Sequence, residues 1–171
     1  GQPKAIAAKE KLGALNSDIK IEAVTTEITR ESVQGLLEGA TLVVDGTDNW
    51  TVRFIANGEC VRRRIPFVHA GVQGLFGQVT TVMPFDGPCL RCIIPLPPPD
   101  VKRFPVVGVT PGLFAMLEAM EALKVIIGLG TTLVGKVLLL NGADMTFDTI
   151  EVQRNPSCPV CGRDVAEGAR L

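Results

Sequence analysis

Apolar and polar positions follow one another in blocks along this chain, and the clearest boundary lies in its first third. Three consecutive apolar β-formers, a leucine and two valines, run directly into the polar segment 45–49. An apolar run that ends in a turn of this kind is typical of a buried parallel strand. We therefore expect a strand over residues 41–45 and a helix over residues 49–64, with Asp48 or Asn49 as the N-cap of that helix.

The other elements follow from periodicity and from cap residues. Apolar residues at a spacing of three to four indicate helices, and alternating apolar and polar residues indicate strands. Short connections between the two are typical of a β-α-β arrangement in a parallel sheet. The expected helices cover residues 4–15, 32–37 and 113–127, and the expected strands cover residues 18–28, 66–73, 74–83, 136–140 and 146–153.

The composition fits one soluble globular domain with a full core. The 171 residues are 46% hydrophobic and 20% charged, which argues against disorder. The formal net charge of -1 gives no reason to expect nucleic acid or a membrane surface as a partner. The most apolar region, residues 106–129, is interrupted by Glu118, Glu121 and Lys124. This spacing of three predicts an amphipathic helix and not a membrane span.

The two ends of the chain lead to expectations about its extent. The sequence has neither an initiator methionine nor a signal peptide, and Pro3 resembles the first turn of a helix that follows a missing strand. These features indicate a fragment or a processed chain. We expect residues 1–162 to form the C-terminal portion of one cytoplasmic domain and residues 163–171 to form a flexible tail.

Several residues allow both a chemical and a structural interpretation. His69 lies on an apolar strand, where a lone histidine is more commonly a core residue than a ligand or a base. Cys60 is most simply a small core residue of the helix over 49–64. The arginine triplet 62–64 could bind an anion, but cations at the end of a helix also complement its dipole.

The proline-rich segment 95–100 excludes a helix or a central strand, so we expect an extended crossover or lid.

The strongest chemical signal is a pair of Cys-x-x-Cys motifs, formed by Cys89 with Cys92 and by Cys158 with Cys161. A gap of two residues lets both sulfurs of one motif reach the same metal, and four thiolates fit tetrahedral zinc. A redox Cys-x-x-Cys would lie at a strand-helix junction and would need no second copy. Four sulfur ligands leave no open position, so we expect a structural zinc that joins the crossover to the C-terminal end.

Two glycine-containing segments resemble nucleotide-binding loops but lack the required context. Residues 130–136 almost match a P-loop, yet Val137 replaces the serine or threonine, and the segment leads from a helix into a strand. Residues 71–77 join two strands and lack the dinucleotide spacing. No Gly-x-Gly-x-x-Gly motif opens a helix in this sequence, which argues against a nicotinamide-dependent oxidoreductase.

Taken together, these features resemble the ThiF/MoeB/HesA family, which is related to the ubiquitin-activating enzymes. The resemblance runs in family order over nearly the whole chain, and it implies a Rossmann-like ThiF/MoeB-type α/β fold with a structural zinc site. The fold would be N-terminally incomplete, because the family's glycine-rich strand-helix unit and ribose-binding acid would precede Gly1. The matching stretches are Gly1-Gln-Pro-Lys4-Ala with Leu12-x-x-Leu15-Asn16, Val44-Asp-Gly-Thr-Asp48-Asn49-x-x-x-Arg53, Gly77-Gln-Val, Gly87-Pro-Cys89-x-Arg-Cys92, Gly108-Val-Thr-Pro-Gly-x-x-Ala-x-x-Glu118-Ala-x-Glu121-Ala-x-Lys124 and Cys158-Pro-Val-Cys161-Gly.

The resemblance also implies an activity, which is ATP-dependent adenylation of the C-terminal glycine of a ubiquitin-like sulfur-carrier protein with a diglycine tail. Lys4 resembles the family's phosphate-contacting lysine, and Asp48 resembles the acid associated with the magnesium of ATP. Asn49 would line the nucleotide site, and Arg53 would brace the turn. A homodimer is the oligomeric state that the family implies.

One departure from the family pattern limits the expected chemistry. Family members that form a thioester or a persulfide carry a cysteine after the proline-rich segment, but this chain has none between Cys92 and Cys158. We therefore expect no sulfur-transfer step, and we expect adenylation only when the same polypeptide or a partner chain supplies the missing half. The alternative is a non-catalytic module or pseudo-enzyme that is stabilised by zinc and binds a ubiquitin-like partner.

Overall fold

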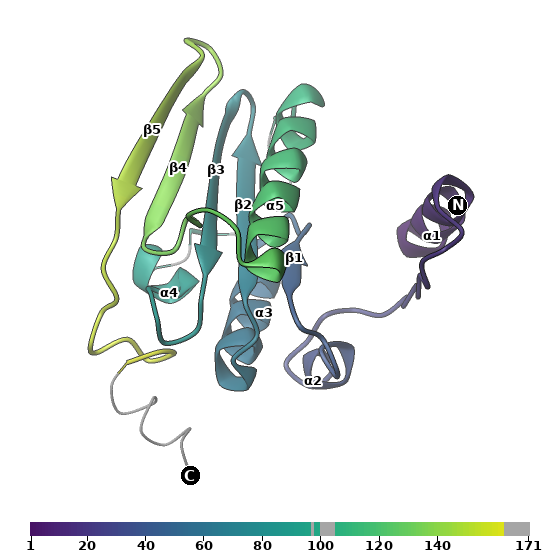
Figure 1. The fold of residues 1–171 in the computed structure, drawn as a ribbon, viewed down its shortest axis with the longest axis horizontal. Helices are drawn as coiled ribbons and strands as arrows, with labels where there is room; N and C mark the ends of the chain where they lie inside the picture. Colours follow the sequence, from purple (N-terminus) through teal and green to yellow (C-terminus); the bar gives the residue numbers. More distant parts are fainter. Residues whose placement is uncertain (97, 100–104, 163–171) are drawn as a thin grey trace.

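The computed structural model describes residues 1–96, 98–99 and 105–162, and it contains a five-stranded sheet with helices on both faces (Figure 1). The helices are α1 (Lys4–Leu15), α2 (Val33–Leu36), α3 (Trp50–Arg63), α4 (Leu90–Ile93) and α5 (Val109–Ile127), and the strands are β1 (Val43–Asp45), β2 (Phe67–Gln73), β3 (Phe76–Val82), β4 (Lys136–Asn141) and β5 (Thr146–Glu151).

The sheet has the strand order β1-β2-β3-β4-β5 and is mixed, not parallel. Among the described strands, only β1 and β2 run parallel, with Asp45 opposite His69. The other pairs are antiparallel. Short turns join β2 to β3 and β4 to β5, and a connection of this length permits only antiparallel pairing. At the first of these turns Gly74 has a φ of 60°. The expected parallel sheet is therefore confirmed for the β1-α3-β2 unit and wrong for the remainder.

Most of the expected elements are present, with shifted ends. α1 has the expected bounds, and α5 begins four residues earlier than expected because Pro111 fits in the first turn of a helix. The short helix α4 was not expected. The strand expected over residues 18–28 is absent, since residues 20–29 form neither helix nor strand. An alternating segment becomes a strand only beside a partner, and no described strand pairs with this one.

Two apolar clusters fill the two faces of the sheet. Phe67 and Val68 are neighbours on β2 and both fully buried, but they belong to different clusters because successive side chains of a strand point to opposite faces. Phe67 packs with residues of α3, and Val68 packs with Phe114 of α5. Cys60 lies in the α3 cluster, as expected, and burial raises the pKa of its thiol to about 12.

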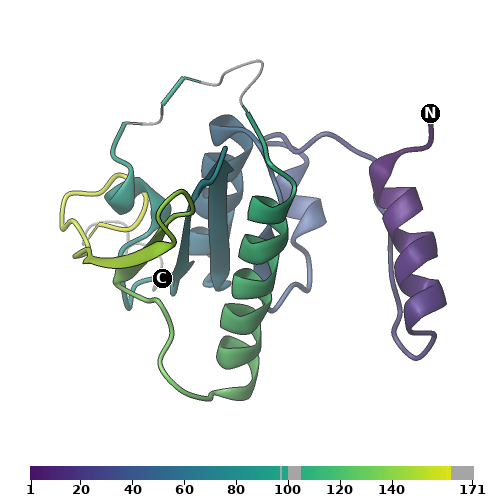
Figure 2. The same ribbon diagram turned by 90° about the horizontal axis from the view of Figure 1, so that it is seen from above.

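Helix α1 stands apart from the sheet in both views (Figures 1 and 2). None of its residues is buried, and Leu12 and Leu15 are 49% and 83% exposed. The unpaired segment 20–29 is part of the connection between α1 and the rest of the chain. In this structure the sheet and α1 share no apolar core.

Among the described residues, no helix is both long and apolar enough to cross a membrane. The tail expected at residues 163–171 lies outside the described residues, as do residues 97 and 100–104 of the proline-rich region.

Candidate functional site

The turn that follows β1 is held by Asp45, the last residue of this strand. The Oδ1 atom of Asp45 accepts hydrogen bonds from the backbone N–H of Thr47 at 2.9 Å and from its hydroxyl group at 2.7 Å. Asn49 then caps α3, because its Oδ1 atom accepts a hydrogen bond from the backbone N–H of Val52 at 2.9 Å. Asp48 is exposed between these fixed residues. Its carboxylate is thus placed at the carboxyl end of β1 and in contact with solvent.

Arg53 supports the same turn from the first part of α3. Its Nη2 atom donates a hydrogen bond to the backbone oxygen of Thr47 at 2.6 Å, and its Nε atom lies 3.4 Å from Oδ2 of Asp45. The guanidinium also lies over the ring of Trp50, 4.9 Å from the ring centroid. Only 8% of Arg53 is exposed. A charge that is buried to this extent needs a partner, and the Asp45 carboxylate supplies it.

His69 lies beneath this turn and is fully buried. Its Nδ1 atom is 2.6 Å from Oδ2 of Asp45. Burial lowers the pKa of His69, so the neutral ring donates its Nδ1 proton to the carboxylate. Burial alone would raise the pKa of Asp45, but hydrogen bonds with His69 and Thr47 outweigh it and hold this pKa below its usual value. His69 is thus a core residue with a hydrogen-bond partner.

A groove of about 620 Å³ extends over the sheet beside this turn, and we call it the sheet groove. Asp48 and Arg53 line it next to the turn, and Gly71 contributes no side chain to its wall. The groove therefore connects the carboxyl end of β1 with the last two strands. The other lining residues are Trp50, Val72, Gln73, Phe76, Gly77, Gln78, Pro98, Pro99, Leu139, Leu140, Asn141 and Asp148.

Several residues of the sheet groove were not predicted as site residues, although Gln78 lies in the Gly77-Gln-Val stretch that resembles the family. The clearest is Gln78, whose Nε2 atom lies 3.5 Å from Nε2 of His69. Asn141 and Asp148 enter the groove from β4 and β5. Alternation along β3 indicates which side chains share a face with Gln78, but only the strand order brings these distant segments together. Asn141 and Asp148 therefore carry too little signal in the sequence alone to be predicted as groove residues.

The arginine triplet stabilises the end of α3. Arg62 and Arg63 both pair with Glu59, at 2.6 and 2.5 Å, and these pairs lower the pKa of Glu59 to about 2. Arg63 also donates to the backbone oxygen of Gln34 at 2.7 Å, which joins α3 to α2. Arg64 follows α3 with a φ of 60°. These contacts account for Arg62 and Arg63 without an anionic ligand.

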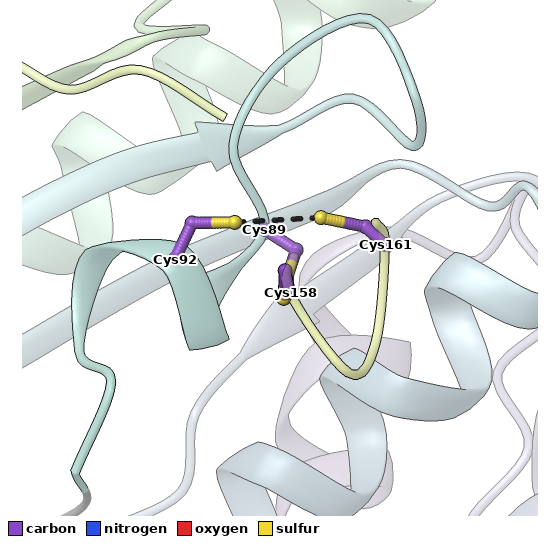
Figure 3. Close-up of side chains that lie close together, drawn as sticks. All are labelled: Cys89, Cys92, Cys158 and Cys161. Carbon is purple, nitrogen blue, oxygen red and sulfur yellow. Dashed lines mark hydrogen bonds between the residues drawn. The ribbon is translucent and has the colours of Figure 1, made fainter. Parts of the chain in front are cut away.

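The four motif cysteines converge at one point between α4 and the C-terminal turn (Figure 3). Their sulfur atoms all lie within 4.8 Å of one another. The Sγ atoms of Cys89 and Cys158 are 3.7 Å apart, and those of Cys92 and Cys161 are 3.4 Å apart. Tetrahedral zinc with Zn–S bonds of about 2.3 Å needs sulfur atoms roughly 3.8 Å apart. The cluster therefore has the ligand set and the spacing that a closed metal site requires.

Hydrogen bonds hold both motifs in this arrangement. The Nε atom of Arg154 donates to the backbone oxygen of Cys161 at 2.7 Å, and its Nη1 atom donates to that of Phe85 at 2.9 Å. The backbone N–H of Asn155 donates to Sγ of Cys92 at 3.4 Å. Such bonds orient ligands before a metal binds. The sequence analysis did not single out Arg154.

The structure does not bring Lys4 to the turn after β1. Lys4 begins α1, which stands apart from the sheet, and it is exposed. Asp48, Asn49 and Arg53 do lie together, and the four cysteines form their own cluster. Of the residues expected to bind the nucleotide, Asp48, Asn49 and Arg53 lie together at the turn after β1 and the start of α3. Lys4 lies apart from them.

An acidic turn at the carboxyl end of a parallel strand, a groove over a mixed sheet and a four-cysteine cluster define an α/β protein of the ThiF type. Residues 1–160 match the ThiF family, and the chain belongs to this family. A crystal structure of E. coli MccB with MccA-N7isoASN has the same fold, with a TM-score of 0.84 and 19% identity over 95% of this chain and 52% of the MccB chain.

Two relatives with established names are closer in sequence. The SAMP-activating enzyme E1 of Haloferax volcanii is 38% identical over 167 residues, and the sulfur carrier protein adenylyltransferase of Thermus thermophilus is 38% identical over 172 residues. Each match covers 95% of this chain. The chain spans 62% of the first relative and 64% of the second. These matches confirm the family that the sequence motifs indicate.

Proposed function

We propose that this chain is part of an ATP-dependent adenylyltransferase that activates the C-terminal glycine of a ubiquitin-like sulfur-carrier protein. The observation that carries the proposal is the position of Asp48, which lies beside the sheet groove at the carboxyl end of β1. Ligands of open α/β sheets bind at this end of the strands. The name of the Thermus thermophilus relative supports the substrate class.

The proposed reaction joins the carrier carboxylate to AMP. A carboxylate oxygen of the terminal glycine attacks the α-phosphorus of ATP, and the bond between this phosphorus and the bridging oxygen breaks, so that pyrophosphate leaves. Magnesium, bound with ATP, would neutralise the charge of the phosphates. Asp48 is the proposed oxygen ligand of this ion, because carboxylates suit hard cations. Asn49 and Arg53 are the proposed nucleotide-binding residues beside it.

The sheet groove is the proposed path of the carrier tail. It extends from the Asp48 turn to β4 and β5, and the wall at Gly71 lacks a side chain. A diglycine tail is narrow and would fit beside such a wall in an extended conformation. We also propose that the enzyme acts as a homodimer in the cytoplasm.

We propose zinc as the ion of the four-cysteine cluster, with Cys89, Cys92, Cys158 and Cys161 as its ligands. Three of these residues are buried, and all four offer a sulfur atom to one point. Four thiolates leave no position for water or substrate, so the ion would be structural. It would join α4 and the proline-rich segment to the end of β5.

Adenylation also needs groups that hold the phosphates of ATP. The sequence has no glycine-rich motif at the start of a helix that could provide backbone amides for them. We propose that the rest of the polypeptide or a partner chain supplies these groups. Lys4 would then reach the nucleotide once α1 docks, as a point charge suited to a phosphate.

The test is exchange of radioactive pyrophosphate into ATP with the full-length polypeptide and a carrier that ends in diglycine. We expect Asp48→Asn to lower the exchange rate at least about 100-fold, because a metal ligand of the transition state is lost. Asp18→Asn, an exposed control far from the groove in sequence, should exchange as the unmodified protein does. Normal exchange by Asp48→Asn would refute the proposal. Exchange by residues 1–171 alone would refute only the need for further groups.

The separation of α1 from the groove favours one competing function, which is a non-catalytic module that binds a ubiquitin-like partner. The double variant Lys4→Ala with Asp48→Asn distinguishes the two. The module predicts unchanged carrier binding and unchanged cellular function. The enzyme predicts that carrier binding persists and that the acyl-adenylate no longer forms.

A further inference from the structure

One row of residues crosses the floor of the sheet groove. Gly71 of β2 lies opposite Gln78 of β3. Gln78 also lies opposite Leu139 of β4, which in turn lies opposite Asp148 of β5. All four residues line the groove, and residues that face one another across strands project from the same face of a sheet. Because Gly71 has no side chain, the end of this row next to Arg53 is open.

Two nitrogen atoms flank the space above Gly71. A Cβ atom at this position would lie 3.4 Å from Nη1 of Arg53 and 3.6 Å from Nε2 of Gln78. Guanidinium and carboxamide nitrogens donate hydrogen bonds and do not accept them. Arg53 is also the only cationic residue among the described residues that line the groove. An anionic oxygen of a bound ligand would therefore find two donors at this point, one of them charged.

Arg53 is held so that its Nη1 atom stays beside Gly71. Its Nε atom lies 3.4 Å from Oδ2 of Asp45, and its Nη2 atom donates to the backbone oxygen of Thr47 at 2.6 Å. The guanidinium also lies over the ring of Trp50. Since a guanidinium is planar and rigid, these contacts fix the direction of its third nitrogen as well. They use Nε and Nη2 and leave Nη1 for the groove.

Gln78 is oriented by His69. The Nδ1 atom of His69 lies 2.6 Å from Oδ2 of Asp45, so the neutral ring carries its proton on Nδ1 and leaves Nε2 as an acceptor. The Nε2 atom of Gln78 lies 3.5 Å from this acceptor. Only the NH2 group of the carboxamide can donate to it, and this group has a second N–H. The contacts from Asp45 through His69 to Gln78 therefore keep the amide nitrogen, and not the amide oxygen, beside Gly71.

We propose that the space above Gly71 is a subsite for the terminal carboxylate of the carrier, with Nη1 of Arg53 and Nε2 of Gln78 as its donors. The inference rests on the proposed function for the identity of this carboxylate. Two donors on one oxygen would stop the glycine carboxylate from rotating and leave its other oxygen for the attack on phosphorus. Gln78 is thus a substrate-binding residue, and His69 is the residue that positions it.

The first test measures binding and needs no catalysis. The probe is N-acetyl-Ala-Gly-Gly, as the free acid and as the C-terminal amide, which lacks the negative charge. Trp50 is the only tryptophan of the sequence and lines the groove, so its fluorescence reports binding to the full-length polypeptide. We expect the unmodified protein to bind the acid about 30-fold more tightly than the amide. In Gln78→Leu this ratio should fall to about threefold, since a hydrogen bond to a charged group contributes at least about a factor of ten.

Two further variants keep this test decisive. Gln34→Leu is the matched control, because it makes the same change in an exposed glutamine of α2 that does not line the groove. It should keep the acid-to-amide preference of the unmodified protein. Gln78→Glu preserves the shape of the side chain and replaces the donor by a charged acceptor, so it should bind the amide more tightly than the acid. Urea denaturation shows which variants are folded, and Gln78→Glu decides the question if Gln78→Leu is not folded.

ATP distinguishes the carboxylate from a phosphate, which offers the same anionic oxygens. Gln78→Leu should bind ATP as tightly as the unmodified protein in isothermal titration calorimetry. It should also raise the KM for the carrier in pyrophosphate exchange about tenfold. Weaker binding of ATP with an unchanged acid-to-amide ratio would overturn the proposal in favour of a phosphate subsite.

Failure of this inference and failure of the proposed function give different results. An acid-to-amide ratio that is the same in Gln78→Leu and in the unmodified protein would overturn the role of Gln78, even if exchange is observed. The absence of saturable binding of the acid would overturn the subsite as well. A ratio that depends on Gln78, in a protein without exchange activity, would support the carboxylate subsite and refute adenylation.

Discussion

Gly77 of β3 lies directly under the ring of Phe114 of α5, so closely that a Cβ atom on Gly77 would approach the ring carbons to distances no side chain tolerates. Phe114 is 1% exposed and central to the cluster between α5 and the sheet. Gly77→Ala should therefore force the ring or the helix to move. We expect a loss of about 1–3 kcal/mol in the free energy of unfolding, measured by urea denaturation.

Gly71→Ala is the matched control, because Gly71 is the glycine of the adjacent strand that faces the sheet groove. A Cβ atom there would meet only Nη1 of Arg53 at 3.4 Å and the Gln78 side chain beyond it. Stability should remain within about 0.5 kcal/mol. If the groove takes the carrier tail, Gly71→Ala should instead raise the KM for the carrier. Equal stability losses for both alanine variants would contradict this interpretation of the two faces.

The N-cap of α3 allows its structural role to be separated from nucleotide binding. Asn49→Ala removes the acceptor for the N–H of Val52 and should lower the free energy of unfolding by about 1 kcal/mol in a denaturant titration. Asn49→Asp keeps an acceptor oxygen and should restore this stability. If Asn49 also binds the nucleotide, Asn49→Asp should still bind ATP more weakly, because it adds a negative charge beside the phosphates. Full recovery of ATP affinity by Asn49→Asp would leave the cap as the sole role.

The sequence was most informative where local rules decide the structure. Asn49 caps α3 because of its own side chain, and the two-residue gap within each cysteine motif lets both of its sulfur atoms reach the same point. The segment 18–28 forms no strand, because none of the described strands pairs with it. Gln78 and Asp148 share a groove only through strand order, and periodicity does not determine strand order. The burial of Glu118 likewise depends on how α5 lies on the sheet.

The buried His69 predicts that the free energy of unfolding depends on pH in the acidic range. Its folded pKa is lowered by burial, so below about pH 6.5 the unfolded chain binds a proton that the folded chain does not bind. His69 by itself should therefore lower the free energy of unfolding on acidification by up to about 1.4 kcal/mol per pH unit. Glu118 opposes this loss, because burial raises its pKa to about 8 and the folded chain then binds a proton that the unfolded chain does not. The lowered pKa of Asp45 adds a second loss at still lower pH, because its stabilising charge disappears as pH falls through its folded pKa. Urea denaturation at intervals from pH 7 to pH 5 measures the first effect.

His69→Gln is the control for this pH dependence, because His69 is the only histidine of the sequence. Glutamine can still donate a hydrogen bond to Asp45 but does not titrate. We expect a loss of about 1–3 kcal/mol at pH 7 from imperfect replacement of the buried ring. The difference in the free energy of unfolding between the unmodified protein and His69→Gln should then narrow as the pH falls from 6.5 to 5, because only the unmodified protein loses the contribution of His69. An unchanged slope in His69→Gln would assign the acid sensitivity to other groups.

The cysteine cluster also predicts how stability depends on metal. Its four sulfur atoms approach one another in the described structure, and neighbouring thiols lower the pKa of Cys161 to about 5 through hydrogen bonds, of which the one with Cys89 is the strongest. A divalent cation would replace these shared protons with metal-sulfur bonds. Structural zinc contributes on the order of 10 kcal/mol in small zinc domains, so its loss should be visible in any unfolding measurement.

We therefore expect the purified full-length protein to contain one zinc per chain by elemental analysis, and Cys158→Ser to contain none and to unfold at a clearly lower temperature. A strong chelator should lower the unfolding temperature of the unmodified protein and have little effect on this variant. Cys60→Ala is the matched control, because Cys60 is a buried cysteine outside the cluster. It should keep its zinc and lose stability only through the small cavity left behind. Zinc lost equally from both variants, or absent from the unmodified protein, would refute the four-cysteine site.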